Sequence, residues 1–186
     1  MAANVLRFAL FGKEFQAGKT VSIHRLIDSL KARGAEIYIE RTFFQYITSA
    51  LGMEVEVSGV FDNYNFDVDF VISIGGDGTF LRAASMVGSK ATPIIGVNTG
   101  RLGFLADIHP DEIDHAIAEI VDGHYAVEPH AVIMVEADGE IIEGSPFALN
   151  DIAVLKRDNA AMISVRTCIN GEYLVTYQAD GLIVST

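Results

Sequence analysis

One aspartate stands among three glycines in the segment Gly75–Thr79, which reads Gly-Gly-Asp-Gly-Thr. The apolar, β-branched run 71–74 before it is typical of a buried strand, and the residues after Thr79 follow the spacing of a helix. A turn between a strand and a helix offers backbone N–H groups to an anion. A carboxylate in this place would repel phosphate. Its presence therefore indicates that Asp77 itself accepts a proton or holds a metal. The alternative is a tight connection whose aspartate caps the helix, since short glycine motifs produce many false positives.

The elements around this turn alternate between strand and helix through about residue 125. Strands are expected at residues 5–12, 36–40, 67–74 and 93–98, and helices at residues 20–33, 43–51, 80–87 and 110–122. Alternation of this kind predicts an α/β domain with a doubly wound parallel sheet over residues 1–125. Ligands of such sheets bind beyond the carboxyl ends of the strands. The turns at residues 75–79 and 98–104 both follow strands, so we expect them to line one crevice.

The pattern changes after residue 130, where helical spacing is no longer found. Asp138-Gly139 predicts a hairpin between strands at residues 132–136 and 140–143, and Asn170-Gly171 predicts a second one between residues 164–169 and 172–177. Residues 126–186 are therefore expected to form an antiparallel all-β domain. The strand-like run 182–186 stops without a turn signal. This favours a β-domain that is incomplete at its C-terminus, the alternative being a natural edge strand.

Composition excludes several classes of protein. Half of the 186 residues are hydrophobic and 20% are charged, which is typical of a globular chain. A net charge of −12 argues against nucleic-acid and anionic-membrane binding, and no apolar run approaches the ~18 residues that span a bilayer. With one cysteine and no signal-peptide pattern, the sequence predicts a cytoplasmic protein. The histidines and Cys168 lack the spacing of a zinc site.

Four segments, taken together, resemble the motifs of the NAD kinases. They are Gly75–Thr79, the run Asn98–Leu105 (Asn-Thr-Gly-Arg-Leu-Gly-Phe-Leu), the run Ala148–Asp151 (Ala-Leu-Asn-Asp), and the run Asp180–Thr186 (Asp-Gly-Leu-Ile-Val-Ser-Thr). Their order and the αβ-then-β layout also match that family, and the resemblance covers essentially the whole chain. Four motifs in order are far more specific than one glycine turn.

The resemblance implies a two-domain enzyme that phosphorylates the 2′-hydroxyl of the adenosine ribose of NAD to give NADP. The phosphoryl donor would be ATP or polyphosphate with a divalent metal, Mg²⁺ being expected, and related enzymes are homo-oligomers. Asp77 matches the proton acceptor of the family, and no metal ligand is assigned. The residues expected to bind the nucleotides are Gly75, Gly76, Gly78, Thr79, Arg82, Phe104, Asn150, Asp151 and Asp180.

Alternatives remain for some of these residues. Arg82 can serve as a forked donor to a pyrophosphate or as a solvated charge on a helix. Phe104 can cover an adenine or nicotinamide ring, or it can be buried between the domains. Asn150, Asp151 and Asp180 would read as turn-forming residues at strand ends if the motif order were ignored.

The chain departs from the family pattern at its end. The fourth motif of the family continues into a Pro-Thr-Gly-Ser-Thr-Ala-Tyr-like loop, whereas the sequence stops at Thr186. We therefore expect this chain alone to be inactive or weakly active. A cation that the family often carries near His130 and Gln178 is also absent. The other candidate functions are a lipid or sugar kinase that shares the Gly-Gly-Asp-Gly turn, against which the second and third motifs count, and a non-catalytic nucleotide-binding module.

Overall fold

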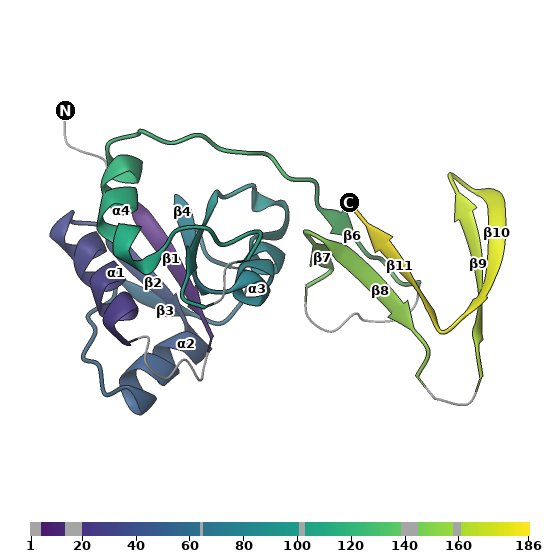
Figure 1. Ribbon diagram of the computed structural model, residues 1–186, viewed down its shortest axis with the longest axis horizontal. Coiled ribbons are helices and arrows are strands. Elements are labelled where there is room, and N and C mark those ends of the chain that lie inside the picture. The colour runs from purple at the N-terminus through teal and green to yellow at the C-terminus, as the bar shows by residue number, and fades with distance from the viewer. Residues whose placement is uncertain (1–4, 14–19, 64, 101–102, 139–144, 158–160) are drawn as a thin grey trace. The chain divides into compact units, whose positions relative to one another are not determined.

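The structure is a computed structural model, which describes residues 5–13, 20–63, 65–100, 103–138, 145–157 and 161–186. The chain divides into two compact units, Met1–Pro129 and His130–Thr186. The α/β elements lie in the first unit and the antiparallel strands in the second (Figure 1). None of the helices in the described ranges is both long enough and apolar enough to cross a membrane.

The first unit is built on a parallel sheet of five strands in the order β3-β2-β1-β4-β5. These strands are β1 (Arg7–Gly12), β2 (Glu36–Glu40), β3 (Gly59–Phe61), β4 (Phe70–Gly75) and β5 (Ile94–Asn98). The predicted α/β class and parallel sheet are confirmed. The edge strand β3 was not predicted, because three residues are too few to show a period.

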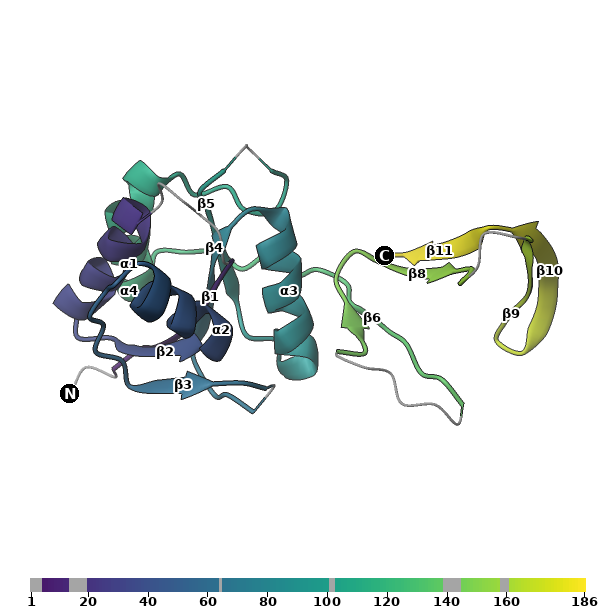
Figure 2. The same ribbon diagram turned by 90° about the horizontal axis from the view of Figure 1, so that it is seen from below.

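The central strands β1 and β4 are apolar along almost their whole length because both faces of the sheet are covered. One face packs on α1 (Thr20–Ala32) and α4 (Ile113–Val121), through side chains such as Leu10 and Ile72. The other face packs on α3 (Asp77–Val87), through side chains such as Phe11 and Val71. Figure 2 shows α1 and α4 on one side of β1 and β4, with α3 on the other.

Two helices differ from the prediction in detail. The segment predicted as one helix over residues 43–51 is a short α2 (Arg41–Gln45) followed by a π-helical turn at Tyr46–Ala50. The helix predicted to begin at Phe80 begins three residues earlier, at Asp77, so that only Gly76 separates it from β4. Glycine as an N-cap gives no side-chain signal, which explains why the sequence placed the start too late.

The described residues of the second unit form three antiparallel strand pairs. They are β6 (Ile133–Met134) with β7 (Phe147–Ala148), β8 (Asp151–Leu155) with β11 (Gly181–Ser185), and β9 (Ile163–Ile169) with β10 (Glu172–Ala179). Asn170 and Gly171 join β9 to β10 with positive φ angles of 52° and 85°, as a type I′ turn requires, so this predicted hairpin is confirmed. The strand predicted at 140–143 and Gly139 of its turn lie outside the described residues.

Gly12, the last residue of β1, offers a test of the packing at the carboxyl end of the sheet. A Cβ at this position would lie 2.2 Å from Cε2 of the buried Phe43 ring. We expect Gly12→Ala to lower the free energy of unfolding by about 1–3 kcal/mol, measured by urea denaturation, because the ring must move in a close-packed core. The control is Gly78→Ala, whose Cβ would meet no heavy atom within 4 Å. An unchanged stability of Gly12→Ala would contradict the packing described for Phe43.

Candidate functional site

The candidate site lies at the carboxyl edge of the parallel sheet. Strands β1 and β4 are neighbours, and from them the chain winds outward in opposite directions, to β2 and β3 on one side and to β5 on the other. The crevice beyond such a pair is where doubly wound sheets bind ligands. Gly75 closes β4 at this edge, next to Gly12 at the end of β1.

The glycine turn is short, and most of it belongs to the helix. Gly76 is the N-cap of α3 in an extended conformation, and its carbonyl accepts the N–H groups of Thr79 and Phe80 at 2.9 and 3.2 Å. The backbone N–H groups of Asp77 and Gly78 belong to the first turn and have no carbonyl partner within the helix. Gly78 is exposed and Thr79 is buried, so the open side of the turn is the side of Gly78.

The carboxylate of Asp77 does not cap its own helix but binds the second motif. Its Oδ2 accepts the backbone N–H of Phe104 at 2.9 Å, and its Oδ1 accepts those of Leu105 at 3.0 Å and Ala106 at 3.3 Å. Three consecutive amides therefore point at one carboxylate. These bonds, and the bond of 3.0 Å from Thr99 N–H to the carbonyl of Gly75, bring the turns after β4 and β5 together, and that they line one crevice stays a prediction.

Two glycines allow this close approach. A Cβ at Gly103 would lie 2.2 Å from Oδ1 of Asp77, so no side chain fits between the loop and the carboxylate. A Cβ at Gly96 of β5 would lie 2.6 Å from the Cα of Ala106, where the returning chain passes the strand. The returning chain is held there by a bond of 3.0 Å from Ile108 N–H to the carbonyl of Gly96. The loop of residues 103–106 is thus fixed on both sides.

The charge of Asp77 is stabilised by these donors. The N–H groups of Phe104 and Leu105, and more weakly that of Ala106, lower the pKa of the carboxyl against the opposing effect of burial. An ionised carboxylate has about four acceptor positions. Three of them are used by the loop, two on Oδ1 and one on Oδ2. The position that no described residue uses is on Oδ2.

Phe104 and Arg82 lie in different surroundings at this edge. The side chain of Phe104 is 100% exposed, although its N–H group is bound to Asp77.

Arg82, in the second turn of α3, donates from Nη2 to Oε1 of the buried Glu40 at 2.6 Å. Glu40 ends β2 and also accepts the N–H of Phe43 at 3.0 Å, so that it is the N-cap of α2. Arg82 is therefore paired and is not merely a solvated charge.

In the second unit, Asn150 and Asp151 lie at one end of the β8–β11 pair and Asp180 at the other. The Nδ2 of Asn150 donates to Oδ2 of Asp151 at 2.8 Å, and both residues are exposed. Asp180 forms an ion pair with Lys156, with 2.6 Å between Oδ1 and Nζ. Asp151 lies opposite Ser185 and Leu155 opposite Gly181 in the ladder. The two ends are therefore about 14 Å apart, and the structure does not bring Asp180 to Asn150.

Sequence reasoning missed Glu40, Gly103 and the amides of Leu105 and Ala106. Glu40 was predicted only as the end of a strand, although an acidic residue just before a helical segment is an N-cap signal. Gly103 is part of the second motif, but nothing in the sequence shows that it faces a carboxylate. The backbone amides carry no sequence signal.

The described residues contain no group of three or more His, Cys, Asp or Glu side chains that could hold a metal ion.

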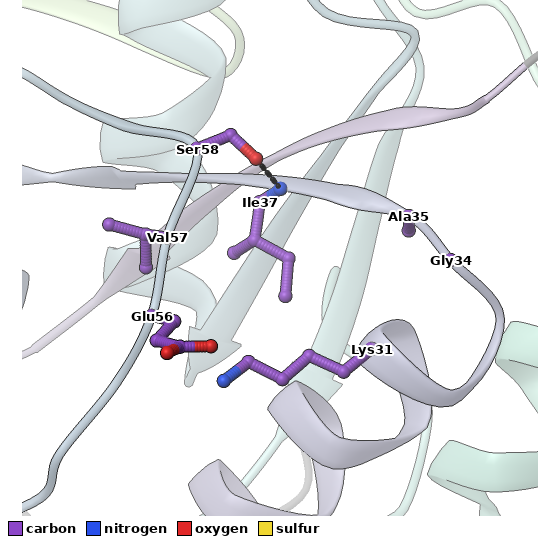
Figure 3. Close-up of a pocket in the computed structure, with 7 residues that line it drawn as sticks. All are labelled: Lys31, Gly34, Ala35, Ile37, Glu56, Val57 and Ser58. Carbon is purple, nitrogen blue, oxygen red and sulfur yellow. Dashed lines mark hydrogen bonds between the residues drawn. The ribbon is translucent and has the colours of Figure 1, made fainter.

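Figure 3 shows an open pocket between the end of α1 at Lys31, the start of β2 at Ile37 and residues 56–58. The hydroxyl of Ser58 accepts the N–H of Ile37 there, at 3.1 Å. This pocket lies at the amino ends of the parallel strands, opposite to the edge that carries Asp77, and is not the candidate site.

An open parallel sheet with a glycine turn and a helix N-terminus at its carboxyl edge is the arrangement of nucleotide-binding α/β proteins. A family model described as the ATP-NAD kinase N-terminal domain matches residues 12–125. The NAD kinase of Bacteroides fragilis is 51% identical over 181 residues, which are 97% of this chain and 62% of that protein. The NAD kinase of Porphyromonas gingivalis is 40% identical over 181 residues, which are again 97% of this chain and 62% of that protein. The chain belongs to the NAD kinase family, as the four motifs indicated.

Solved structures agree with the fold. An NAD kinase from Archaeoglobus fulgidus in complex with ATP superposes with a TM-score of 0.62 at 26% identity, over 97% of this chain and 60% of that one. A yeast NADH kinase complexed with NADH superposes with a TM-score of 0.75 over 97% of this chain and 57% of that one. Because the two sequences are only 19% identical, this comparison shows that the two proteins share a fold and nothing more. The chain spans about 62% of the length of the curated relatives it matches.

The bonds to Asp77 predict how stability depends on pH. The folded-state pKa of Asp77 lies below its usual value of about 3.9. Ionised Asp77 therefore stabilises the folded chain above pH ~4, and this contribution is lost as the pH falls through the lowered pKa. We expect the difference in unfolding free energy between the wild type and Asp77→Asn, measured by urea denaturation, to be constant from pH ~7 to ~5 and to shrink below ~4. A difference that does not change on acidification would contradict the bonding of the ionised carboxylate.

Proposed function

We propose that the protein transfers the γ-phosphoryl group of ATP to the 2′-hydroxyl of the adenosine ribose of NAD, giving NADP and ADP. The observation that carries the proposal is the carboxylate of Asp77, fixed by the N–H groups of residues 104–106 at the carboxyl edge of the sheet. Family membership supplies the substrate class. Polyphosphate is an alternative donor.

Asp77 is the proposed proton acceptor. The ribose hydroxyl donates to the open acceptor position on Oδ2, beside the N–H of Phe104. As the hydroxyl oxygen bonds to the γ-phosphorus and the bond to ADP breaks, the proton passes to the carboxylate. The lowered pKa makes Asp77 a weak base. A weak base suffices because phosphoryl transfer has a loose transition state, in which orienting the nucleophile matters more than removing its proton early.

The glycine turn and the residues around it are the proposed contacts of the nucleotides. Gly75, Gly76, Gly78 and Thr79 let phosphate oxygens approach the first-turn N–H groups of α3, which carry the positive end of the helix dipole. Arg82 uses only Nη2 among the described residues, which leaves Nε and Nη1 to donate to a pyrophosphate. The exposed ring of Phe104 is the proposed stacking face for a base.

In the second unit, Asn150 and Asp151 are the proposed contacts of the ribose and adenine. Their side chains offer both donors and acceptors to solvent. Asp180 is a further proposed contact of the dinucleotide, held at the other end of the β8–β11 pair by Lys156. The distance between the two ends suits a ligand as long as a dinucleotide.

The divalent metal, Mg²⁺ in our proposal, is assigned to ATP. The described residues do not form a cluster that fits a metal held by the protein alone. Mg²⁺ keeps several waters and binds well to substrate phosphates, so it does not require such a cluster. When bound, it neutralises charge on the transferring phosphoryl group.

The activity is proposed for a polypeptide as long as the relatives, of which this chain spans about 62%. Residues 1–186 alone are expected to bind nucleotides weakly and to turn over slowly or not at all. We further propose a cytoplasmic homo-oligomer. The net charge of −12 makes nucleic acid and anionic membranes poor partners.

A substrate panel tests the proposal. A polypeptide of the relatives' full length is incubated with ATP and Mg²⁺ and with NAD, fructose 6-phosphate or diacylglycerol, and transfer of the γ-phosphoryl group is measured. We expect NADP from NAD and no product from the other two. The NAD kinase of Bacteroides fragilis is the positive control. Transfer to diacylglycerol or to the sugar, with none to NAD, would overturn the assignment in favour of a lipid or sugar kinase.

Asp77→Asn tests the proton acceptor in the same polypeptide. The amide keeps the size of the side chain but cannot take a proton, so we expect kcat to fall by about 10²-fold or more. The affinity for NAD should change less, because most contacts of the dinucleotide are made elsewhere. Steady-state kinetics and NAD titration give both quantities. An unchanged kcat would remove Asp77 from the role, and a loss confined to metal affinity would make it a metal contact.

A further inference from the structure

Proton acceptance does not account for the position of Asp77 between two motifs. Its carboxylate joins the first turn of α3 to a loop 27 to 29 residues further along the chain. A base needs one acceptor position facing the substrate, whereas three are used by the loop. Hydrogen bonds to a charged group are stronger than bonds between neutral groups. The carboxylate is therefore a strong constraint on the loop.

The constraint acts on one exposed aromatic ring. Phe104 is the only described phenylalanine that is exposed, since the others are buried or partly buried. Within the loop, its backbone is fixed by the bond of 2.9 Å to Oδ2 of Asp77. Gly103 before it lies against the carboxylate, and Ala106 after it lies against Gly96 of β5. The ring thus projects from a backbone whose position depends on Asp77.

We propose that Asp77 is also a positioning residue, whose carboxylate fixes the loop of residues 103–106 and thereby holds Phe104 where it stacks on the base of the nucleotide. This inference rests on the proposed function for the identity of the ligand. Asp77 then has two separate effects. It orients the ribose hydroxyl through the open position on Oδ2, and it lowers the entropy that Phe104 loses when a base binds.

The effect on the loop is measured without a ligand, by hydrogen exchange of the backbone amides with NMR on this chain. We expect Asp77→Ala to speed exchange at Phe104, Leu105 and Ala106 by about tenfold or more. The matched control is Glu112→Ala. Glu112 accepts the N–H of His109 at 3.1 Å, so this variant should speed exchange at His109 alone. Unchanged exchange at all three loop amides in Asp77→Ala would overturn the inference, whatever the chain binds.

Asp77→Asn is the second variant should Asp77→Ala not fold. The amide group keeps one acceptor oxygen and replaces the other by a donor. At least one of the three loop amides must then lose its bond, with faster exchange at that residue. Exchange at the wild-type rate at all three would again overturn the inference.

The effect on binding is separated from the hydroxyl contact by an NAD analogue that lacks the 2′-hydroxyl of the adenosine ribose. We expect Asp77→Ala and Phe104→Ala each to weaken binding of the analogue by about three- to tenfold, the range of an aromatic contact. In the Phe104→Ala background, Asp77→Ala should have no further effect, because the two act through one contact. Additive losses, or no loss in Asp77→Ala, would overturn the positioning role.

The outcomes also separate this inference from the proposed function. If the wild-type chain binds the analogue and NAD but exchange at the loop is independent of Asp77, the inference fails and the function stands. Binding of neither ligand by a polypeptide of the relatives' full length would overturn the proposed function and the stacking role with it. The effect of Asp77 on the loop would then be decided by exchange alone.

Discussion

The hydrogen bonds from three consecutive backbone amides to Asp77 are the interaction on which the candidate site depends. They bring the loop after β5 onto the turn after β4, and they require glycine at position 103, since a Cβ would meet the carboxylate. They also offset a negative charge that would otherwise repel the phosphates of a nucleotide. The same bonds thus determine how the two turns lie against each other, the electrostatics around the carboxylate, and which acceptor position on Oδ2 the described residues leave unused.

Two other acidic side chains, Glu40 and Asp180, also accept hydrogen bonds or form ion pairs that offset their charge. Glu40 is bound by Arg82 and by the N-terminus of α2, and Asp180 is bound by Lys156. The negative charge of these side chains is therefore offset locally, in a chain whose net charge is −12. These contacts act over a few ångströms and are less affected by the long-range field.

The fold could largely be predicted because its signals are local. Buried strands such as β4 are apolar runs, α1 has one apolar face, and Asn170-Gly171 defines a two-residue turn. The partners of Asp77 could not be predicted, because they are backbone groups brought near by the pairing of β4 with β5. Glu40 and Arg82 are 42 residues apart and meet for the same kind of reason. The motifs identified the residue types at the site, whereas their contacts depend on tertiary structure.

The pairing of β1 with β4 has a consequence for the order in which the molecule assembles. In this parallel pair Phe8 lies opposite Phe70, with β2, β3 and two helices between them in the chain. Contacts so distant in sequence form slowly because a long loop must close first, whereas a hairpin such as β9–β10 forms in microseconds. When the whole chain refolds, the β9–β10 hairpin is therefore expected to form before the β1–β4 pair.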